Sequence, residues 1–261
     1  MTRKAAVIVA AGISLLALVE TGAAVTARAR VATDADWAAA AAEVRAGFGP
    51  GDVIAFAPAW VDQIGRAALG DLVTPEMAGR SDVDRYARVW EVSIRGAHSP
   101  DAAGAKLVRQ AQHGRVHVAL YEKPATPIVY DFTEHAEELI GGRYERRTLE
   151  IDYRPRRGLL VAAQRQPTTY EWREVPLGDT LVVYGGIHDY YARKSADGLV
   201  DVRVDVDGVP KLTTRIGNDD GWRRFELDTR ALSGTRHTVT FRISAANPAW
   251  RSFGFHAEAR R

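Results

Sequence analysis

The sequence predicts a multi-part α+β protein made of an N-terminal membrane helix, a small α/β unit and an antiparallel β-sandwich of the jelly-roll type. Three observations support this prediction. An unbroken apolar run over residues 5–19 follows the basic residues Arg3 and Lys4. Helical and extended patterns alternate over residues 34–123, as in a three-layer-like α/β unit with a parallel sheet. Short runs of period-two patterning fill residues 126–261 and indicate the sandwich.

Residues 1–27 are expected to be either an uncleaved membrane anchor or a cleaved signal peptide. A helix over residues 5–19 would span about 22 Å, which is less than a hydrocarbon core of about 30 Å. Extending it to Ala27 gives enough length but includes Glu20. Val25-Thr26-Ala27 is a small-residue cleavage site for a signal peptide. Both alternatives place the body outside the cytoplasm, anchored in the inner membrane of a bacterial envelope or exported after cleavage.

Composition excludes several classes of function. The chain has 35 Lys and Arg residues against 33 Asp and Glu residues, so its formal net charge is only +2. The chain lacks the excess of basic residues that is typical of nucleic-acid-binding proteins, and no nucleic-acid partner is expected. The chain has 0 cysteines. Disulfides, thiolate nucleophiles and cysteine-based zinc sites are therefore excluded, which fits a bacterial envelope protein better than a small disulfide-stapled secreted domain.

The α/β unit is predicted element by element. Thr33, with Asp36 three residues later, indicates the start of a helix that ends near Gly47. The apolar run over 53–57 is typical of a buried strand. The elements expected after it are short helices over 61–69 and 75–80, a strand over 88–94, a helix over 99–113 and a strand over 115–121. This order predicts a parallel sheet of about three strands.

Period-two patterning is clearest in the second half. Valines at every second position over 200–206 alternate with charged residues, so one face of that strand is apolar and buried and the other is polar and exposed to solvent. Asp207-Gly208 then indicates a hairpin turn. The other expected strands cover 128–133, 148–153, 158–163, 170–175, 180–187, 211–216, 222–227, 239–243 and 253–257.

The α/β part resembles a known family. Its order of Asp36-Trp37, Pro50-Gly51-Asp52-Val53-Ile54, Arg88-Val89-Trp90-Glu91-Val92 and then 116–122 is similar to the soluble ectodomain of bacterial polyprenol-phosphate-sugar glycosyltransferases, of the dolichyl-mannosyltransferase and aminoarabinose-transferase type. Those enzymes carry their catalytic acids between many membrane helices, whereas this chain has at most one apolar stretch. The resemblance therefore implies an envelope setting and glycan-related partners, but no catalytic residue.

The β half, residues 126–261, resembles galactose-binding-like and carbohydrate-binding-module sandwiches in general layout. Two of its loops combine aromatic rings with polar groups, and sugars are bound by rings that cover their C–H faces and by polar groups that bind their hydroxyls. The alternative is that these tyrosines and the tryptophan cap the core and that the charged residues pair with one another. The ligand-binding candidates are His188, Asp189, Tyr190, Tyr191, Arg193, Trp250 and Arg251.

Metal and cofactor chemistry is not expected. Asp219-Asp220 with Glu258 offers oxygen ligands for calcium, but Asp219-Asp220 followed by glycine is also what a tight turn requires, and the turn is the preferred interpretation. The chain contains no Gly-x-Ser-x-Gly elbow, no phosphate-binding glycine-rich loop and no His-Glu-x-x-His motif. The sequence therefore predicts no metal site and no cofactor.

Several carboxylates lie in the connection that follows the first predicted strand. Ligands of α/β sheets bind at this carboxyl end of the strands. Two of these carboxylates could provide acid–base catalysis on a glycoside. Ion pairing with the interspersed arginines Arg66, Arg80 and Arg85 is the preferred interpretation. The carboxylates are Asp62, Asp71, Glu76 and Asp82.

The sequence thus predicts a membrane-anchored, extracytoplasmic, non-catalytic binding or accessory protein, whose β-sandwich recognises an envelope glycan or a protein partner. No catalytic residue is assigned. The alternative is a carbohydrate-active hydrolase or transferase with carboxylates at the domain junction. A purely structural assembly subunit is a third hypothesis.

Overall fold

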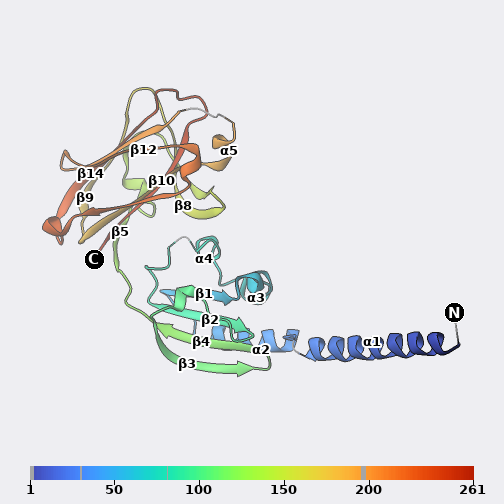
Figure 1. Ribbon diagram of the computed structural model, residues 1–261. Helices are drawn as coiled ribbons and strands as arrows, with labels where there is room; N and C mark the ends of the chain where they lie inside the picture. Colours follow the sequence, from blue (N-terminus) through green and yellow to red (C-terminus); the bar gives the residue numbers. More distant parts are fainter. Residues whose placement is uncertain (1–2, 30, 81, 195–197) are drawn as a thin grey trace. The chain divides into compact units, whose positions relative to one another are not determined.

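The computed structural model describes residues 3–29, 31–80, 82–194 and 198–261, and its chain divides into two compact units (Figure 1). The first unit comprises Met1–Gly70 and Arg88–Glu122, and the second comprises Asp71–Ala87 and Lys123–Arg261. Asp71–Ala87 thus belongs with the β half, although the sequence placed it in the α/β domain.

The first helix, α1 (Arg3–Ala29), covers most of the predicted leader, of which Met1 and Thr2 lie outside the described residues. Within the described residues, no helix combines the length and apolarity needed to cross a membrane.

The predicted helix start at Thr33 is confirmed. In α2 (Asp34–Gly47) the Thr33 hydroxyl accepts a hydrogen bond from the Asp36 N–H at 3.2 Å, and the Asp36 carboxylate accepts one from the Thr33 N–H at 2.9 Å. This reciprocal pair is a capping box, which satisfies backbone donors that would otherwise lack partners.

The sheet of the first unit is mixed, so the predicted parallel sheet is wrong. Its strands are ordered β1-β2-β4-β3, with β1 parallel to β2 and the other neighbours antiparallel. The strands are β1 (Asp52–Ala57), β2 (Arg88–Ile94), β3 (Lys106–His113) and β4 (Val116–Glu122). The remaining elements before β5 are η1 (Ala59–Val61), α3 (Asp62–Leu69), α4 (Pro75–Ala78) and η2 (Pro100–Ala102).

The helix predicted over 99–113 is also wrong, because Lys106–His113 forms the strand β3. Its lysine, leucine, arginine, glutamine and alanine residues favour a helix by intrinsic propensity. Pairing with β4 overrides that preference, since Gly114 at φ 54° makes a tight turn that joins the two strands as a hairpin.

Gly65 in α3 lies against the ring of Phe56, and a Cβ at this position would overlap that ring. Gly65→Ala is therefore expected to destabilise the first unit by about 1–2 kcal/mol, because overpacking outweighs the better helix propensity of alanine. Urea unfolding measures the change. Ala67→Gly, at an exposed position of the same helix, is the control for propensity alone and should cost about 1 kcal/mol. A stabilising Gly65→Ala would contradict the packing.

The predicted β-sandwich is confirmed (Figure 1). Within the described residues, one sheet has the order β13-β10-β15-β8-β7, with β5 also paired to β15, and the other has the order β12-β11-β14-β9-β6. Neighbouring strands in both sheets are antiparallel. Their bounds are β5 (Ile128–Asp131), β6 (Ile140–Gly141), β7 (Glu145–Ile151), β8 (Arg154–Ala162), β9 (Thr168–Pro176), β10 (Thr180–Ile187), β11 (Val200–Val206), β12 (Val209–Ile216), β13 (Arg223–Asp228), β14 (Arg236–Ser244) and β15 (Ser252–Arg260).

Short helices join several of these strands: η3 (Ala136–Glu138), α5 (Asp189–Ala192), η4 (Asn218–Asp220) and η5 (Arg230–Leu232).

The core lies between the two sheets. Valines 200, 202, 204 and 206 all face it, as their alternation predicts. Its centre is aromatic: the rings of Trp172 and Phe241 meet edge to face at 5.8 Å, and Phe132 meets the Trp172 ring at 5.2 Å. Such edge-to-face contacts are favourable beyond the area they bury.

The hairpin of β7 and β8 packs against glycines of β15 and β10. A Cβ at Gly254 would lie 2.7 Å from Cδ1 of Leu149, and one at Gly186 would lie 3.0 Å from Cδ1 of Ile151 and 2.6 Å from the Gly221 carbonyl oxygen, so glycine at both positions leaves room for the hairpin. The Asp152 N–H at the hairpin tip donates to Asp189 Oδ1 at 2.9 Å. The tip therefore lies beside the loop that follows β10.

Candidate functional site

Three exposed aromatic side chains lie on loops at one end of the sandwich, here called the loop end. Tyr153, in the turn between β7 and β8, is 78% exposed, Tyr190 in α5 is 55% exposed, and Trp250, just before β15, is 53% exposed. Large aromatic residues are more usually buried, so their exposure at one end of the fold indicates a contact surface.

Two of these aromatic residues have a strained backbone. Tyr153 has φ 57° and Trp250 has φ 58°, which is the left-handed region that bulky residues rarely adopt. Each costs about 1–2 kcal/mol relative to an ordinary conformation. At Tyr153 this conformation belongs to the two-residue turn that it forms with Asp152, whose φ is 52°. At Trp250 it fits a functional position, because such strain concentrates at functional sites.

Two pockets at the loop end are lined by residues that the structure describes. The tryptophan pocket, of about 520 Å³, is lined by polar and aromatic groups from α5 and from the segments after β8 and before β15. These include Gln164, Arg165, Tyr191, Asn247, Trp250 and Arg251. The aspartate pocket, of about 430 Å³, is lined by Asp152, Tyr153, Asp189, Ala192, Arg193, Asn218 and Asp219.

The two pockets are neighbours, because hydrogen bonds of Asn218 connect their walls. Arg251 Nη1 donates to Asn218 Oδ1 at 3.1 Å, and Asn218 Nδ2 donates to the Ala192 carbonyl at 3.3 Å. The ring of Tyr191, in the tryptophan pocket, meets that of Tyr190 edge to face at 5.1 Å. The loop end is thus one continuous surface with aromatic, guanidinium, amide and carboxylate groups.

The structure brings together the two loops chosen from sequence. Tyr191, Trp250 and Arg251 line one pocket, and Asp189 and Arg193 line the other. Asp189 also pairs with Arg193 at 3.8 Å, as the alternative interpretation expected.

His188 lines neither pocket. Its Nδ1 accepts a hydrogen bond from the Tyr190 N–H at 3.3 Å, so this ring caps α5. Burial lowers the pKa of His188, and the nearby charge of Arg147 acts in the same direction. Both effects favour the neutral ring, whose unprotonated nitrogen the cap requires.

Sequence reasoning missed Asp152, Tyr153, Gln164 and Arg165. The Asp-Tyr pair lies between two strand patterns, and a two-residue turn there was a usable signal. The contact of this pair with the loop after β10 depends on how the β7–β8 hairpin packs. No local sequence pattern predicts that packing.

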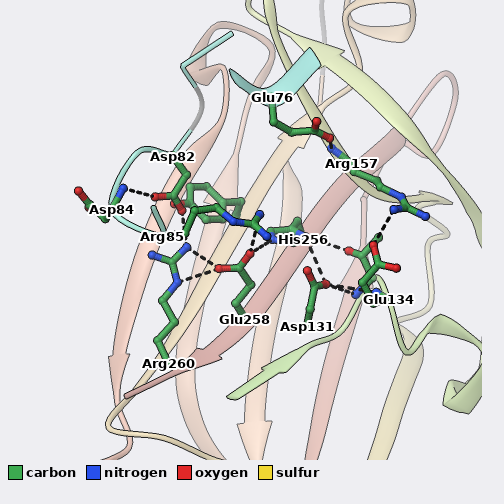
Figure 2. A network of polar contacts seen from close by, with 12 residues as sticks. Glu76, Asp82, Asp84, Arg85, Asp131, Glu134, Arg157, His256, Glu258 and Arg260 are labelled. Carbon is green, nitrogen blue, oxygen red and sulfur yellow. Dashed lines mark hydrogen bonds and ion pairs between the residues drawn. The ribbon is translucent and has the colours of Figure 1, made fainter. Parts of the chain in front are cut away.

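A second polar cluster lies on the outer face of the β10–β15 sheet (Figure 2) and is here called the Glu258 network. Glu258 accepts hydrogen bonds from Arg260 Nε at 2.8 Å and Arg85 Nη1 at 3.3 Å, and it bonds to His256 Nε2 at 2.9 Å. Asp82 pairs with Arg260 and accepts a hydrogen bond from the Tyr184 hydroxyl at 2.7 Å. Because Asp82 and Arg85 belong to Asp71–Ala87, the network holds that segment against the sheet.

Burial and pairing oppose each other in the pKa values of this network. Burial alone would raise the pKa of Glu258, but the hydrogen bond to His256 and the charges of Arg260 and Arg85 outweigh it and lower the pKa to about 2. For Asp82, too, burial would raise the pKa, and the hydrogen bond and charge of Arg260 lower it overall. Both carboxylates are therefore charged at neutral pH, and both depend on Arg260.

The Glu258 network borders a pocket of about 200 Å³, lined in part by Thr133, His256, Arg156 and Asp131. Thr133 Oγ1 lies 2.9 Å from His256 Nδ1, and His256 Nε2 lies 2.9 Å from the Glu258 carboxylate. This order of hydroxyl, imidazole and carboxylate resembles a nucleophile, its base and an acid. However, the N–H groups of Thr133 and Glu134 both donate to Asp131 Oδ1, at 2.8 and 3.2 Å. Neither is therefore free to stabilise an oxyanion.

Metal binding at the same place is also disfavoured. Ligand-type atoms of Asp131, His256 and Glu258 lie within 4.8 Å of one another. Arg85 and Arg260 already bond to the Glu258 carboxylate, and their positive charges oppose a cation beside it. The geometry fits a structural role for the network.

The carboxylates proposed for acid–base chemistry are engaged in other contacts. Asp62 pairs with Arg66 within α3, and Asp82 pairs with Arg260. Glu76 accepts a hydrogen bond from the Arg157 N–H at 3.0 Å. For Asp82 the hydrogen bond and charge of Arg260 lower the pKa, whereas a general acid requires a raised one.

No family model and no curated protein matches this chain. Solved structures similar to it include carbohydrate-binding modules. One comprises the CBM51-2 and INT domains of Clostridium perfringens ZmpB: it has 17% identity and a TM-score of 0.35, and the match covers 47% of this chain and only 28% of that one.

Two further similar structures are smaller proteins. CBM51 of Clostridium perfringens GH95 in complex with methyl-galactose has 9% identity and a TM-score of 0.40, over 50% of this chain and 99% of that one. A family 35 carbohydrate binding module of Clostridium thermocellum has 13% identity and a TM-score of 0.31, over 47% and 92%. Similarities this low assign no ligand to this chain. None of these structures is a glycosyltransferase, and that resemblance stays a prediction.

Proposed function

We propose that the second unit is a glycan-binding module and that the loop end is its binding surface. The observation that carries the proposal is the exposure of Tyr153, Tyr190 and Trp250 beside two connected pockets, with a strained left-handed backbone at Trp250. A sugar ring has an apolar C–H face and a rim of hydroxyls. An aromatic ring covers the face, and neighbouring amide, guanidinium and carboxylate groups bind the rim.

The setting of this activity is part of the same proposal. The protein would act outside the cytoplasm of a bacterium as an accessory protein of the envelope, attached through residues 1–27 or released after their cleavage. The apolar side chains of Ile13, Leu16 and Leu18 in α1 are 64%, 59% and 71% exposed, which favours a surrounding that covers them, such as a bilayer.

Titration calorimetry of the full chain tests the glycan proposal. Neutral and acidic mono- and oligosaccharides are titrated one by one, and saturable binding to at least one of them is expected. Tyr153→Ala and Tyr190→Ala should each weaken that binding by about fivefold or more, because each removes a ring that contacts the ligand.

Trp60→Ala is the matched control. Trp60 is 58% exposed but belongs to the first unit and lines neither pocket, so its removal should leave the affinity unchanged. The absence of saturable binding across the sugars would contradict the proposal. Equal losses for Trp60 and the two tyrosines would show that the loop end is not the site.

A further inference from the structure

The two pockets of the loop end differ in charge. Among its described lining residues, the tryptophan pocket contains the two arginines Arg165 and Arg251 and no aspartate or glutamate. The described lining of the aspartate pocket contains Asp152, Asp189 and Asp219 against one arginine. Two connected pockets of opposite charge would distinguish the charged end of a ligand from its neutral end.

Arg165 is well placed to contact a charged ligand. It is exposed and directly follows Gln164, whose carbonyl accepts a hydrogen bond from the Ala245 N–H at 2.8 Å and whose backbone forms a bridge with Ser244. The backbone that carries Arg165 is therefore fixed to β14, while the guanidinium faces solvent. Arg165 and Trp250 line the same pocket.

We propose that the loop end selects acidic sugars, with the anionic group in the tryptophan pocket against Arg165 and the apolar face of the ring on Trp250. This inference rests on the proposed glycan binding and specifies its ligand class. A guanidinium forms two parallel hydrogen bonds with a carboxylate, sulfate or phosphate, and such charge-assisted bonds are stronger than those to a neutral hydroxyl. The carboxylates of the aspartate pocket repel the same group and so fix the orientation of the sugar.

The test compares neutral sugars with acidic counterparts of the same ring configuration, which carry the charged group at C6. Glucose is compared with glucuronate, galactose with galacturonate, and galactose with its 6-sulfate and 6-phosphate, by titration of the full chain. The acidic member of at least one pair is expected to bind about fivefold to tenfold more tightly. The pair with the largest ratio identifies the anion that fits. That ratio should fall towards 1 in 0.5 M NaCl, because salt screens exposed charges.

Arg165→Ala should abolish the preference, because it weakens binding of the acidic sugar much more than binding of the neutral sugar. Arg230→Ala is the matched control: Arg230 is exposed and follows β13, whose last residue Asp228 pairs with Thr180 at the start of β10, at the opposite end from the loop end. This variant should keep the full preference.

The outcomes separate the two proposals. Neutral sugars that bind as tightly as their acidic partners, or an acidic preference that survives Arg165→Ala, would overturn the charge inference and leave glycan binding intact. If neither member of any pair binds, the glycan proposal fails together with it.

Discussion

Glu258→Ala is expected to destabilise the second unit by about 3 kcal/mol, because it leaves the buried guanidinium of Arg260 with Asp82 as its remaining carboxylate partner. Glu258 is fully buried, and its carboxylate also bonds to Arg85 and His256. Glu258→Gln keeps the shape and removes the charge, so it separates loss of packing from loss of the ion pair. We expect it to lose most of the same stability.

The same carboxylate predicts how stability depends on pH. The pKa of Glu258 is lowered from 4.5 to about 2 in the folded protein. A lowered folded-state pKa means that the unfolded chain binds the proton more tightly. The contribution of Glu258 is therefore complete above about pH 4.5 and is lost as the pH falls towards 2. Glu258→Gln should flatten the stability profile in that window.

Hydrogen exchange provides the most specific measurement. Because Arg85 and Asp82 connect Asp71–Ala87 to the sheet, exchange in that segment should rise in Glu258→Gln before the rest of the second unit is affected. Glu145→Gln, which removes an exposed carboxylate paired with Arg147 at 3.2 Å, is the control and should change neither readout. Unchanged protection of the segment in Glu258→Gln would show that other contacts hold it.

The β half was predictable from sequence because period-two alternation is a direct consequence of one buried face. The four alternating valines of β11 and the Asp207-Gly208 turn define their hairpin by themselves, and Asp207 and Gly208 take φ 49° and 78° as that turn requires. The structure of the first unit was harder to predict from the sequence. In Lys106–His113 intrinsic propensity and final structure disagree, and the partner that decides the outcome, β4, follows in the sequence.

Site residues were predictable only where a single loop combined several aromatic and polar residues. The loop after β10 and the segment before β15 stand out by composition, and both line the pockets of the loop end. Tyr153 and Arg165 come from ordinary strand ends and become part of the surface only through tertiary packing. The Glu258 network could not be predicted for the same reason, because its members Asp82 and Arg260 are separated by 178 positions in the sequence.

Trp250→Gly and Trp250→Ala are expected to have the same effect on binding and different effects on stability. Both remove the ring that the proposal places against the sugar, so both should weaken binding by about thirtyfold or more. Alanine keeps the strain of φ 58°, whereas glycine adopts this conformation freely. Trp250→Gly should therefore be more stable than Trp250→Ala by about 1 kcal/mol in urea unfolding.

This pair of variants also tests why the strain exists. If Trp250 served only the fold, both variants would bind sugar as well as the original protein does. If the strain is maintained because it presents the ring, the more stable glycine variant binds no better than the alanine variant. Stability and affinity would then change independently at one residue, as expected where a strained position is retained for binding.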